Sequence, residues 1–269
     1  MKNGTETAVK TTPNIIREPR IYVVGRQNVD RGELDKFLVE YGMTWETDTE
    51  MGGEQLVEAG GRLCYVSYGK GRKTNAEYVA NILEQKHGSV LEHAVWNFII
   101  AGVSRSFTHE LIRHRAGWGY SQLSQRYVDE SEANYVEPEI IAEDAELHAL
   151  WQKTIEASHE AYVQLTEGLI AKLAEKGVAG TSRRKMSREA ARSVLPNATE
   201  TMIFVTANAR ALRHFIELRG SEGADAEIRR VALEMLRIMQ HEAPNLFADY
   251  KIETLPDGRQ IATTPHEKV

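Results

Sequence analysis

The longest regular pattern in the chain runs from Ala142 to Lys176 and reads AEDAELHALWQKTIEASHEAYVQLTEGLIAKLAEK. Its apolar side chains recur every three or four residues, which is the period of an amphipathic helix. They are Leu147, Leu150, Trp151, Ile155, Tyr162, Leu165, Leu169 and Leu173. Gly177 follows directly, and a glycine at this position commonly ends a helix. The sequence therefore predicts one long helix.

The segments on both sides of this helix predict shorter elements. Helices are expected at 31–41, 51–62, 75–86, 187–194, 208–218 and 225–241, the last closed by Pro244. Strands are expected at 21–24, 95–103 and 201–206, and Asp257-Gly258 marks a late hairpin. Because helices outnumber strands and the two do not alternate regularly, the pattern favours an α+β fold over a doubly wound sheet.

The expected domain organisation is simple. Residues 1–18 are polar and lack hydrophobic periodicity, which predicts a flexible leader. A chain of 269 residues is long enough to bury a sizeable core. We therefore expect a single domain over 19–250, followed by a C-terminal hairpin and tail over 251–269.

Composition excludes several classes of protein. With 42% hydrophobic and 27% charged residues the chain is not globally disordered. No apolar run reaches the roughly 18 residues that cross a bilayer, and residues 1–20 lack a signal-peptide core. We therefore expect a cytoplasmic protein without a membrane partner. The formal charge of 33 − 39 = −6 argues against nucleic-acid binding.

No metal site is expected. Cys64 is the only cysteine, which rules out internal disulfides and a thiolate metal cluster. It lies between Leu63 and Tyr65, a context that favours a small buried hydrophobe over a nucleophile. His109 and His114 are five residues apart, about 140° around a helix, so they do not share the face that a common metal requires.

The densest polar cluster is ELIRHRAGWGYSQLSQRY, from Glu110 to Tyr127. In one interpretation its arginines complement the negative end of a helix, and its serines and glutamines form a polar strand edge. In the other, convergent arginines and hydroxyls bind a phosphorylated metabolite, because guanidinium–phosphate contacts are strong and directional. Arg192, Arg210 and Arg219 occur further along the chain and favour the second interpretation.

At these residues the sequence resembles the flavin-dependent thymidylate synthases. Their signature is Arg-His-Arg, seven residues, Ser, and Arg two positions later. The resemblance extends from Arg62 to Tyr250. It rests on six segments in order: Gly61–Tyr65, His87–His93, Arg113–Arg115, Ser121–Tyr127, Ala191–Thr199 and Asn208–Arg210. This chain has eight residues, Ala116 to Leu123, where the signature has seven.

The resemblance implies a fold and an activity. The fold would be a mainly antiparallel sheet flanked by helices, in a homotetramer whose subunits share FAD sites. The activity would be reductive C5 methylation of dUMP to dTMP, with methylenetetrahydrofolate as carbon donor and NADPH as reductant. The single thiol, Cys64, lies in a matched segment but outside the segments expected to bind the ligands, so activation of the pyrimidine by a cysteine is not expected.

The resemblance also implies the site residues. FAD would contact Ser89, Arg113, His114, Arg115, Gln122, Asn208, Arg210 and His214. The nucleotide would contact Glu110, Arg113, Gln122, Leu123, Ser124, Gln125, Arg126, Arg192 and Arg219. Arg219 would be the catalytic residue, polarising the uracil ring.

Two alternatives remain open at this stage. The first is a methylase that acts on UMP as well as dUMP with the same flavin chemistry, in a modified-nucleoside pathway. The second is a flavin-, nucleotide- or RNA-binding protein without catalysis. The extra residue between Ala116 and Leu123 bears on the first, because it would face the sugar or base of the nucleotide.

Overall fold

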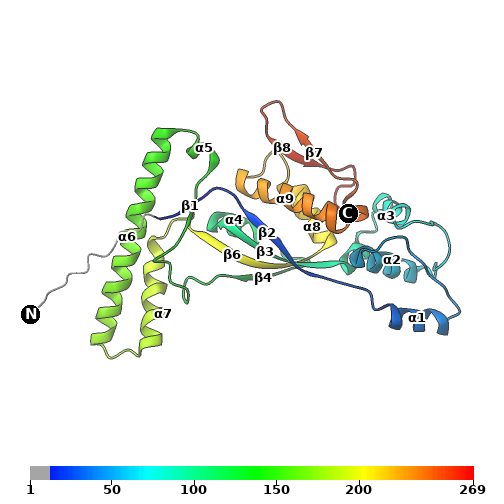
Figure 1. Ribbon diagram of the computed structural model, residues 1–269, viewed down its shortest axis with the longest axis horizontal. Helices are drawn as coiled ribbons and strands as arrows, with labels where there is room; N and C mark the ends of the chain where they lie inside the picture. The colour runs from blue at the N-terminus through cyan, green and yellow to red at the C-terminus, as the bar shows by residue number, and fades with distance from the viewer. Residues whose placement is uncertain (1–12) are drawn as a thin grey trace, which may run out of the picture. The chain divides into compact units, whose positions relative to one another are not determined.

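The computed structural model describes residues 13–269 (Figure 1). The strands are β1 (Ile15–Ile16), β2 (Arg20–Arg26), β3 (Val95–Ser104), β4 (Trp118–Gln122), β5 (Tyr135–Val136), β6 (Glu200–Asn208), β7 (Lys251–Thr254) and β8 (Gln260–Thr263). The α-helices are α1 (Arg31–Glu40), α2 (Gly52–Cys64), α3 (Asn75–Glu84), α4 (Arg105–Leu111), α5 (Glu139–Ala142), α6 (Ala145–Glu175), α7 (Gly180–Ala191), α8 (Ala209–Arg219), α9 (Ala226–Glu242) and α10 (Pro244–Phe247). Two 3-10 helices, η1 (Gly88–His93) and η2 (Arg192–Val194), complete the described chain.

The main sheet has four strands in the order β2-β3-β6-β4. Its neighbours run antiparallel: Asn97 of β3 bonds Thr206 of β6, while Arg105, just after β3, donates to the carbonyl of Thr199, just before β6. Every second side chain of β6 is buried, namely Thr201, Ile203, Val205 and Ala207, and the side chains between them are partly or fully exposed. The mixture of helices with an antiparallel sheet confirms the α+β expectation, although the small β1–β5 pair is parallel.

Two compact units make up the chain. One contains Ala101–Ser106 and Gln122–Met202 together with residues 13–18, and we call it the helical-hairpin unit. The other contains Pro19–Ile100, Phe107–Ser121 and Ile203–Val269, and we call it the sheet unit. Of the leader expected over 1–18, residues 1–12 lie outside the described residues, and Ile15–Ile16 forms β1, which pairs with β5.

Helix α6, with 31 residues, is the longest element of the helical-hairpin unit. The side chain of Asp144 accepts the backbone N–H groups of Glu146 and Leu147, which fixes the first turn. The predicted end at Gly177 is confirmed, because this glycine has a φ of +72°. Helix α7 packs against α6 and begins at Gly180, seven residues before the expected start. The prediction was wrong because residues 180–186 are polar and show no apolar period.

Helices α8 and α9 supply much of the core of the sheet unit. Arg213 of α8 is 1% exposed, and its guanidinium forms two hydrogen bonds with the Asp249 carboxylate at 2.7 and 2.8 Å. Helix α9 ends at Glu242, just before Pro244, as expected. The proline also begins α10, because a proline fits the first helical turn. Strands β7 and β8 pair antiparallel and confirm the late hairpin.

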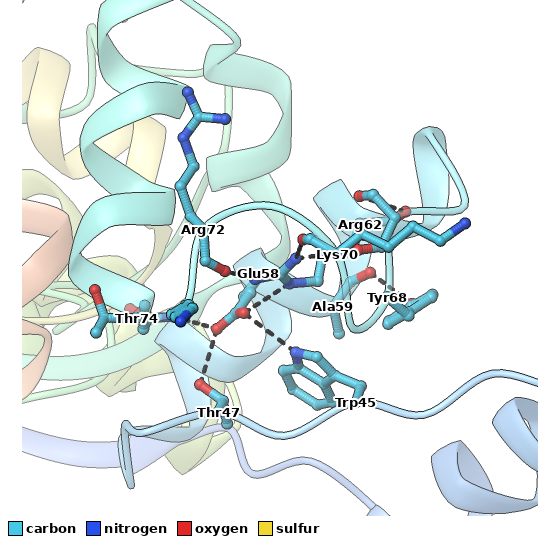
Figure 2. A network of polar contacts seen from close by, with 12 residues as sticks. Trp45, Thr47, Glu58, Ala59, Arg62, Tyr68, Lys70, Arg72 and Thr74 are labelled. Atoms are coloured by element: carbon cyan, nitrogen blue, oxygen red, sulfur yellow. Dashed lines mark hydrogen bonds and ion pairs between the residues drawn. The ribbon is translucent and has the colours of Figure 1, made fainter.

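A buried ion pair fixes the chain after α2 (Figure 2). Arg62 donates from Nε to Glu58 at 2.7 Å, and both side chains are almost fully buried. The same guanidinium donates to the backbone carbonyls of Ser67, Lys70 and Arg72 at 2.8–3.1 Å. One side chain thereby holds the whole loop that leads to α3. Trp45 and Thr47 donate to the Glu58 carboxylate from the opposite side.

None of the helices between residues 13 and 269 combines the length and the apolar character needed to span a bilayer.

Candidate active site

Three predicted site residues meet in the sheet unit. Arg219, at the end of α8, donates from Nη1 to Glu110 Oε2 at 2.6 Å and from Nε to His114 Nε2 at 3.1 Å. Glu110 belongs to α4, and His114 follows that helix directly. The Arg219 side chain is 18% exposed and that of Glu110 is 31% exposed. The guanidinium is thus held from two sides while part of it faces solvent.

His114 is neutral in this arrangement. Burial, together with the charges of Arg219 and His214, lowers its pKa from 6.5 to about 4. Because Nε2 accepts the hydrogen bond from Arg219, the ring proton lies on Nδ1. Tyr120 donates its hydroxyl to the His114 carbonyl at 2.7 Å, which anchors the chain here. The exposed ring of His214 lies edge-on to His114, with 5.8 Å between centroids.

The extra residue of the arginine segment lies in a turn packed onto the start of α8. Gly117 has a φ of +76°, and its carbonyl accepts the backbone N–H of Asn208 at 3.1 Å. A Cβ at Gly117 would lie 2.7 Å from Asn208 Nδ2 and 2.8 Å from Ala211 Cβ. Trp118 stacks on Tyr120 with 5.8 Å between ring centroids. The turn is exposed, yet its conformation is fixed by packing against α8.

The sheet unit also contains a hollow of about 320 Å³. It is lined by residues of α2, α3, η1 and α8 and of the turns beside them: Gly61, Cys64, Tyr65, Ile82, Lys86, His87, Gly88, Ser89, Val90 and Arg210. Two predicted flavin residues, Ser89 and Arg210, line this hollow together. Arg210 is also paired with Glu92 at 2.6 Å.

Cys64 departs from the sequence expectation of a small buried hydrophobe. Its side chain is exposed and lines the same hollow, with Sγ 3.5 Å from the carbonyl oxygen of Gly60. The apolar neighbours in sequence misled the prediction, because Leu63 and Tyr65 are exposed as well. The thiol nevertheless lies beside predicted flavin residues, so it is close to one of the proposed ligand segments.

Apart from Arg113, which belongs to the sheet unit, the remaining predicted nucleotide residues lie in the helical-hairpin unit. Arg126 donates from Nε to Glu189 of α7 at 2.9 Å, and both side chains are partly exposed. The Ser124 hydroxyl accepts the backbone N–H of Arg126 at 3.4 Å. Leu123 donates its backbone N–H to the carbonyl of Met202 at 2.9 Å, which joins this segment to β6. Gln122 donates its side-chain amide to Thr201.

Arg105 is a charged neighbour that the sequence reasoning missed. It opens α4, and burial lowers its pKa, as does the positive charge of Arg192. Arg192 was predicted to bind the nucleotide. The only available signal for Arg105 was its position eight residues before Arg113 of the signature segment, which alone predicts nothing about contact.

Comparisons with known proteins identify the family. The family model described as "Thymidylate synthase complementing protein" matches residues 47–245. A flavin-dependent thymidylate synthase of Mycolicibacterium gilvum (strain PYR-GCK) is 54% identical over 224 residues, covering 82% of this chain and 88% of that protein. The chain belongs to this family. The flavin-dependent thymidylate synthase of Mycobacterium sp. (strain JLS) is 53% identical over 237 residues, covering 86% and 92% of the two chains.

A solved structure shares the fold. The crystal structure of a UMP/dUMP methylase, PolB, from Streptomyces cacaoi, bound with 5-Br UMP, aligns with a TM-score of 0.61 at 19% identity. The alignment covers 88% of this chain and 96% of that one. At this identity the likeness concerns the fold alone.

The family's flavin cofactor is compatible with the hollow. Gly88 has no side chain at a point where a Cβ would lie 3.0 Å from Arg210 Nε, so the backbone approaches the guanidinium closely. The Arg210 guanidinium, the Gly88 backbone N–H and the Ser89 hydroxyl are hydrogen-bond donors that suit the phosphate of a dinucleotide. The volume is at the low end for ligand pockets, which fits part of such a cofactor.

The other predicted flavin residues have different surroundings. Arg113 and Arg115 are exposed, and their side chains form no hydrogen bond or ion pair with residues 13–269. Asn208 caps α8 by accepting the backbone N–H of Ala211 at 2.8 Å. Gln122 belongs to the helical-hairpin unit, whereas the other residues of the flavin set belong to the sheet unit. Within residues 13–269, no three His, Cys, Asp or Glu side chains gather as a metal site would require.

Proposed function

We propose that this protein catalyses the reductive C5 methylation of dUMP to dTMP. Methylenetetrahydrofolate would be the carbon donor, FAD the redox cofactor and NADPH the reductant. Membership of the family and its named relatives support the activity. The observation that carries it in this chain is Arg219, held between Glu110 and His114 with part of its guanidinium exposed.

Arg219 has the properties needed beside a pyrimidine that acquires negative charge. A fixed cation stabilises charge that develops in the transition state without reorganising. Glu110 and His114 restrict the guanidinium to one orientation, and neutral His114 adds no competing positive charge. The acidic Glu110 partner also limits the attraction of Arg219 for any anion in the resting protein.

Arg126, Ser124 and Arg192 would bind the nucleotide phosphate. Guanidinium and hydroxyl donors position a phosphate monoester, and positioning lowers the barrier of the step that follows. Without a ligand, the Arg126 guanidinium donates a hydrogen bond to the Glu189 carboxylate. Phosphate binding therefore requires Arg126 to exchange or share this partner.

Ser89, Arg210 and the neighbouring backbone of Gly88 would hold the phosphates of FAD. Bound there, the flavin would supply the hydride chemistry, which protein side chains lack. His114, His214, Asn208, Arg113, Arg115 and Gln122 complete the proposed cofactor contacts. These side chains bind and orient the cofactor.

A methylase acting on UMP as well as dUMP is the second candidate. The Gly117 turn, one residue longer than the family signature, favours it. Measuring kcat/KM for both nucleotides on the natural protein and on a Gly117 deletion tests this candidate. A ratio that is unchanged in a folded, active deletion variant would show that the turn does not set substrate breadth.

We also propose a homotetramer in the cytoplasm, as the family resemblance and the sequence predict. The predicted FAD residues are distributed over both units of the chain, which accords with cofactor sites assembled from several subunits. Sedimentation of the flavin-saturated enzyme tests the assembly. An active, flavin-saturated monomer would overturn it.

The decisive experiment is a methylation assay on the purified protein. Flavin absorbance and dTMP formation from dUMP, methylenetetrahydrofolate and NADPH are expected together. A protein that binds flavin and nucleotide without forming dTMP would instead be the non-catalytic binding protein, and RNA binding would then be tested directly.

A further inference from the structure

Glu130 is a buried carboxyl in the segment that carries the proposed phosphate ligands. It is four residues beyond Arg126 and is 5% exposed. Its backbone N–H donates to the hydroxyl of Tyr162 on α6 at 3.2 Å, and its carbonyl accepts from Ala133. No local pattern in the sequence singles it out, because its neighbours Asp129, Ser131 and Glu132 are polar as well.

Two buried polar atoms next to each other in this segment lack hydrogen-bond partners. Glu130 Oε1 and Gln125 Nε2 are both covered, and neither finds a partner among residues 13–269. Burial raises the pKa of Glu130, and the Gln125 side chain opposes that rise by favouring the carboxylate. A buried donor and acceptor left unpaired destabilise the segment unless another state satisfies them.

The charges around Glu130 come from three elements. Arg105 of α4 favours the ionised carboxylate, whereas Asp129 of the same loop and Glu200 of β6 oppose it. The uncharged hydroxyls of Tyr135 and Tyr162 also face this region. Asp129 is paired with Arg188 at 2.7 Å, and Glu200 accepts from Asn134 at 2.6 Å and from the backbone of Gly102.

Arg105 connects this carboxyl to the proposed phosphate site. Its guanidinium lies within electrostatic reach of both Glu130 and Arg192: burial and Arg192 lower the pKa of Arg105, and Glu130 raises it. Burial raises the pKa of Glu130 to about 7, so the group is divided between its two forms near neutral pH. A phosphate bound at Arg192 would partly cancel the positive potential that Arg105 and Arg192 create. It would therefore disfavour the ionised carboxylate of Glu130.

We propose that Glu130 is the positioning residue of the Ser124–Arg126 segment and that it takes up a proton from solvent when a nucleotide phosphate binds. This inference rests on the proposed function. The uptake is a simple protonation: a carboxylate oxygen receives H⁺ from the buffer, and no other bond changes. The neutral acid is the cheaper form to bury, and it places no competing negative charge near the phosphate.

Titration calorimetry with dUMP tests the proton uptake directly. Binding is measured at pH 7 in two buffers with different heats of ionisation, which gives the number of protons exchanged. We expect the natural protein to take up about half a proton more than Glu130→Gln, because a group with a pKa near 7 is half protonated beforehand. Ionisation of the dUMP phosphate contributes equally to both proteins and cancels in the difference.

Glu132→Gln is the matched control, because it removes the same charge from an exposed position two residues away. It should keep the proton uptake of the natural protein. The affinity of the natural protein for dUMP should also rise as the pH falls from 8 to 7, and that slope should flatten in Glu130→Gln. A merely structural role for Glu130 would change affinity without changing the slope or the proton count.

An infrared difference spectrum of the natural protein covers the case in which Glu130→Gln does not fold. Adding dUMP should produce the carbonyl band of a protonated, buried carboxyl. Absence of that band, or equal proton counts in the natural and Glu130→Gln proteins, would overturn the inference while leaving the methylation assay unaffected. Failure of dUMP to bind at all would overturn both the inference and the proposed function.

Discussion

Arg219 Nε donates a hydrogen bond to Nε2 of His114 over 3.1 Å, joining residues 105 positions apart in the sequence. The contact makes the two groups interdependent. Burial and the arginine charge together hold the imidazole neutral, and the neutral imidazole accepts the bond that orients the arginine.

The first prediction is that Arg219→Leu raises the pKa of His114 and lowers turnover more than nucleotide affinity. In the natural protein folding favours the neutral ring, so stability falls as the pH drops from 6.5 toward 4. Losing the Arg219 charge should weaken that dependence. The pKa is measured by NMR of the His114 ring, and turnover by single-turnover kinetics. An unchanged chemical step would reject the role of Arg219.

The second prediction concerns Arg126. Arg126→Ala should weaken dUMP binding by about 30-fold, the equivalent of roughly 2 kcal/mol for one charge-assisted contact, and should leave flavin binding nearly unchanged. Glu189→Gln is the matched variant, because it releases Arg126 from its partner and should keep or strengthen nucleotide binding. Equal losses of both ligands in Arg126→Ala would show that the site assignment is wrong.

The third prediction is that Cys64→Ala retains most of its methylation activity. The thiol lines the hollow with Ser89 and Arg210, so the substitution should alter flavin affinity by a small factor. Flavin fluorescence and turnover are measured on the same preparation. A fall in turnover of several orders of magnitude, with both ligands still bound, would mean that the thiol takes part in the chemistry.

The fourth prediction is that Gly117→Ala lowers stability by about 1–3 kcal/mol, because the position requires a positive φ and has no room for a Cβ. Gly119→Ala is the control. Its Cβ would have only an ordinary contact, 3.6 Å from Thr206 Cβ. Urea unfolding compares the two, and equal midpoints would contradict the packing of the turn.

The fifth prediction is that Arg62→Met lowers stability by about 3–5 kcal/mol, because it leaves the buried Glu58 carboxylate without its partner (Figure 2). Lys36→Met, which breaks an exposed pair with Glu33, should cost less than about 1 kcal/mol. Thermal unfolding measures both. Faster proteolysis within residues 67–72 of Arg62→Met would report the release of the loop.

The sequence by itself determined the features that depend on neighbouring residues. The long α6 helix, its end at Gly177 and the strands β2, β3 and β6 follow from periodicity and capping, which are local properties. The order of the arginine and histidine segments was likewise sufficient to indicate the family. The start of α7 was not predictable, since polar residues 180–186 become helical by packing against α6.

Only the tertiary structure decided which side chains meet and which are covered. The chain brings Glu110 and His114 to Arg219 from more than one hundred residues away, exposes Cys64 beside Ser89, and buries Glu130 near Arg105. These relationships depend on how α4, α8 and the strands pack, and no local pattern in the sequence encodes them. Burial and distant charges in turn set the ionisation of His114 and Glu130, so their chemistry is a property of the folded protein.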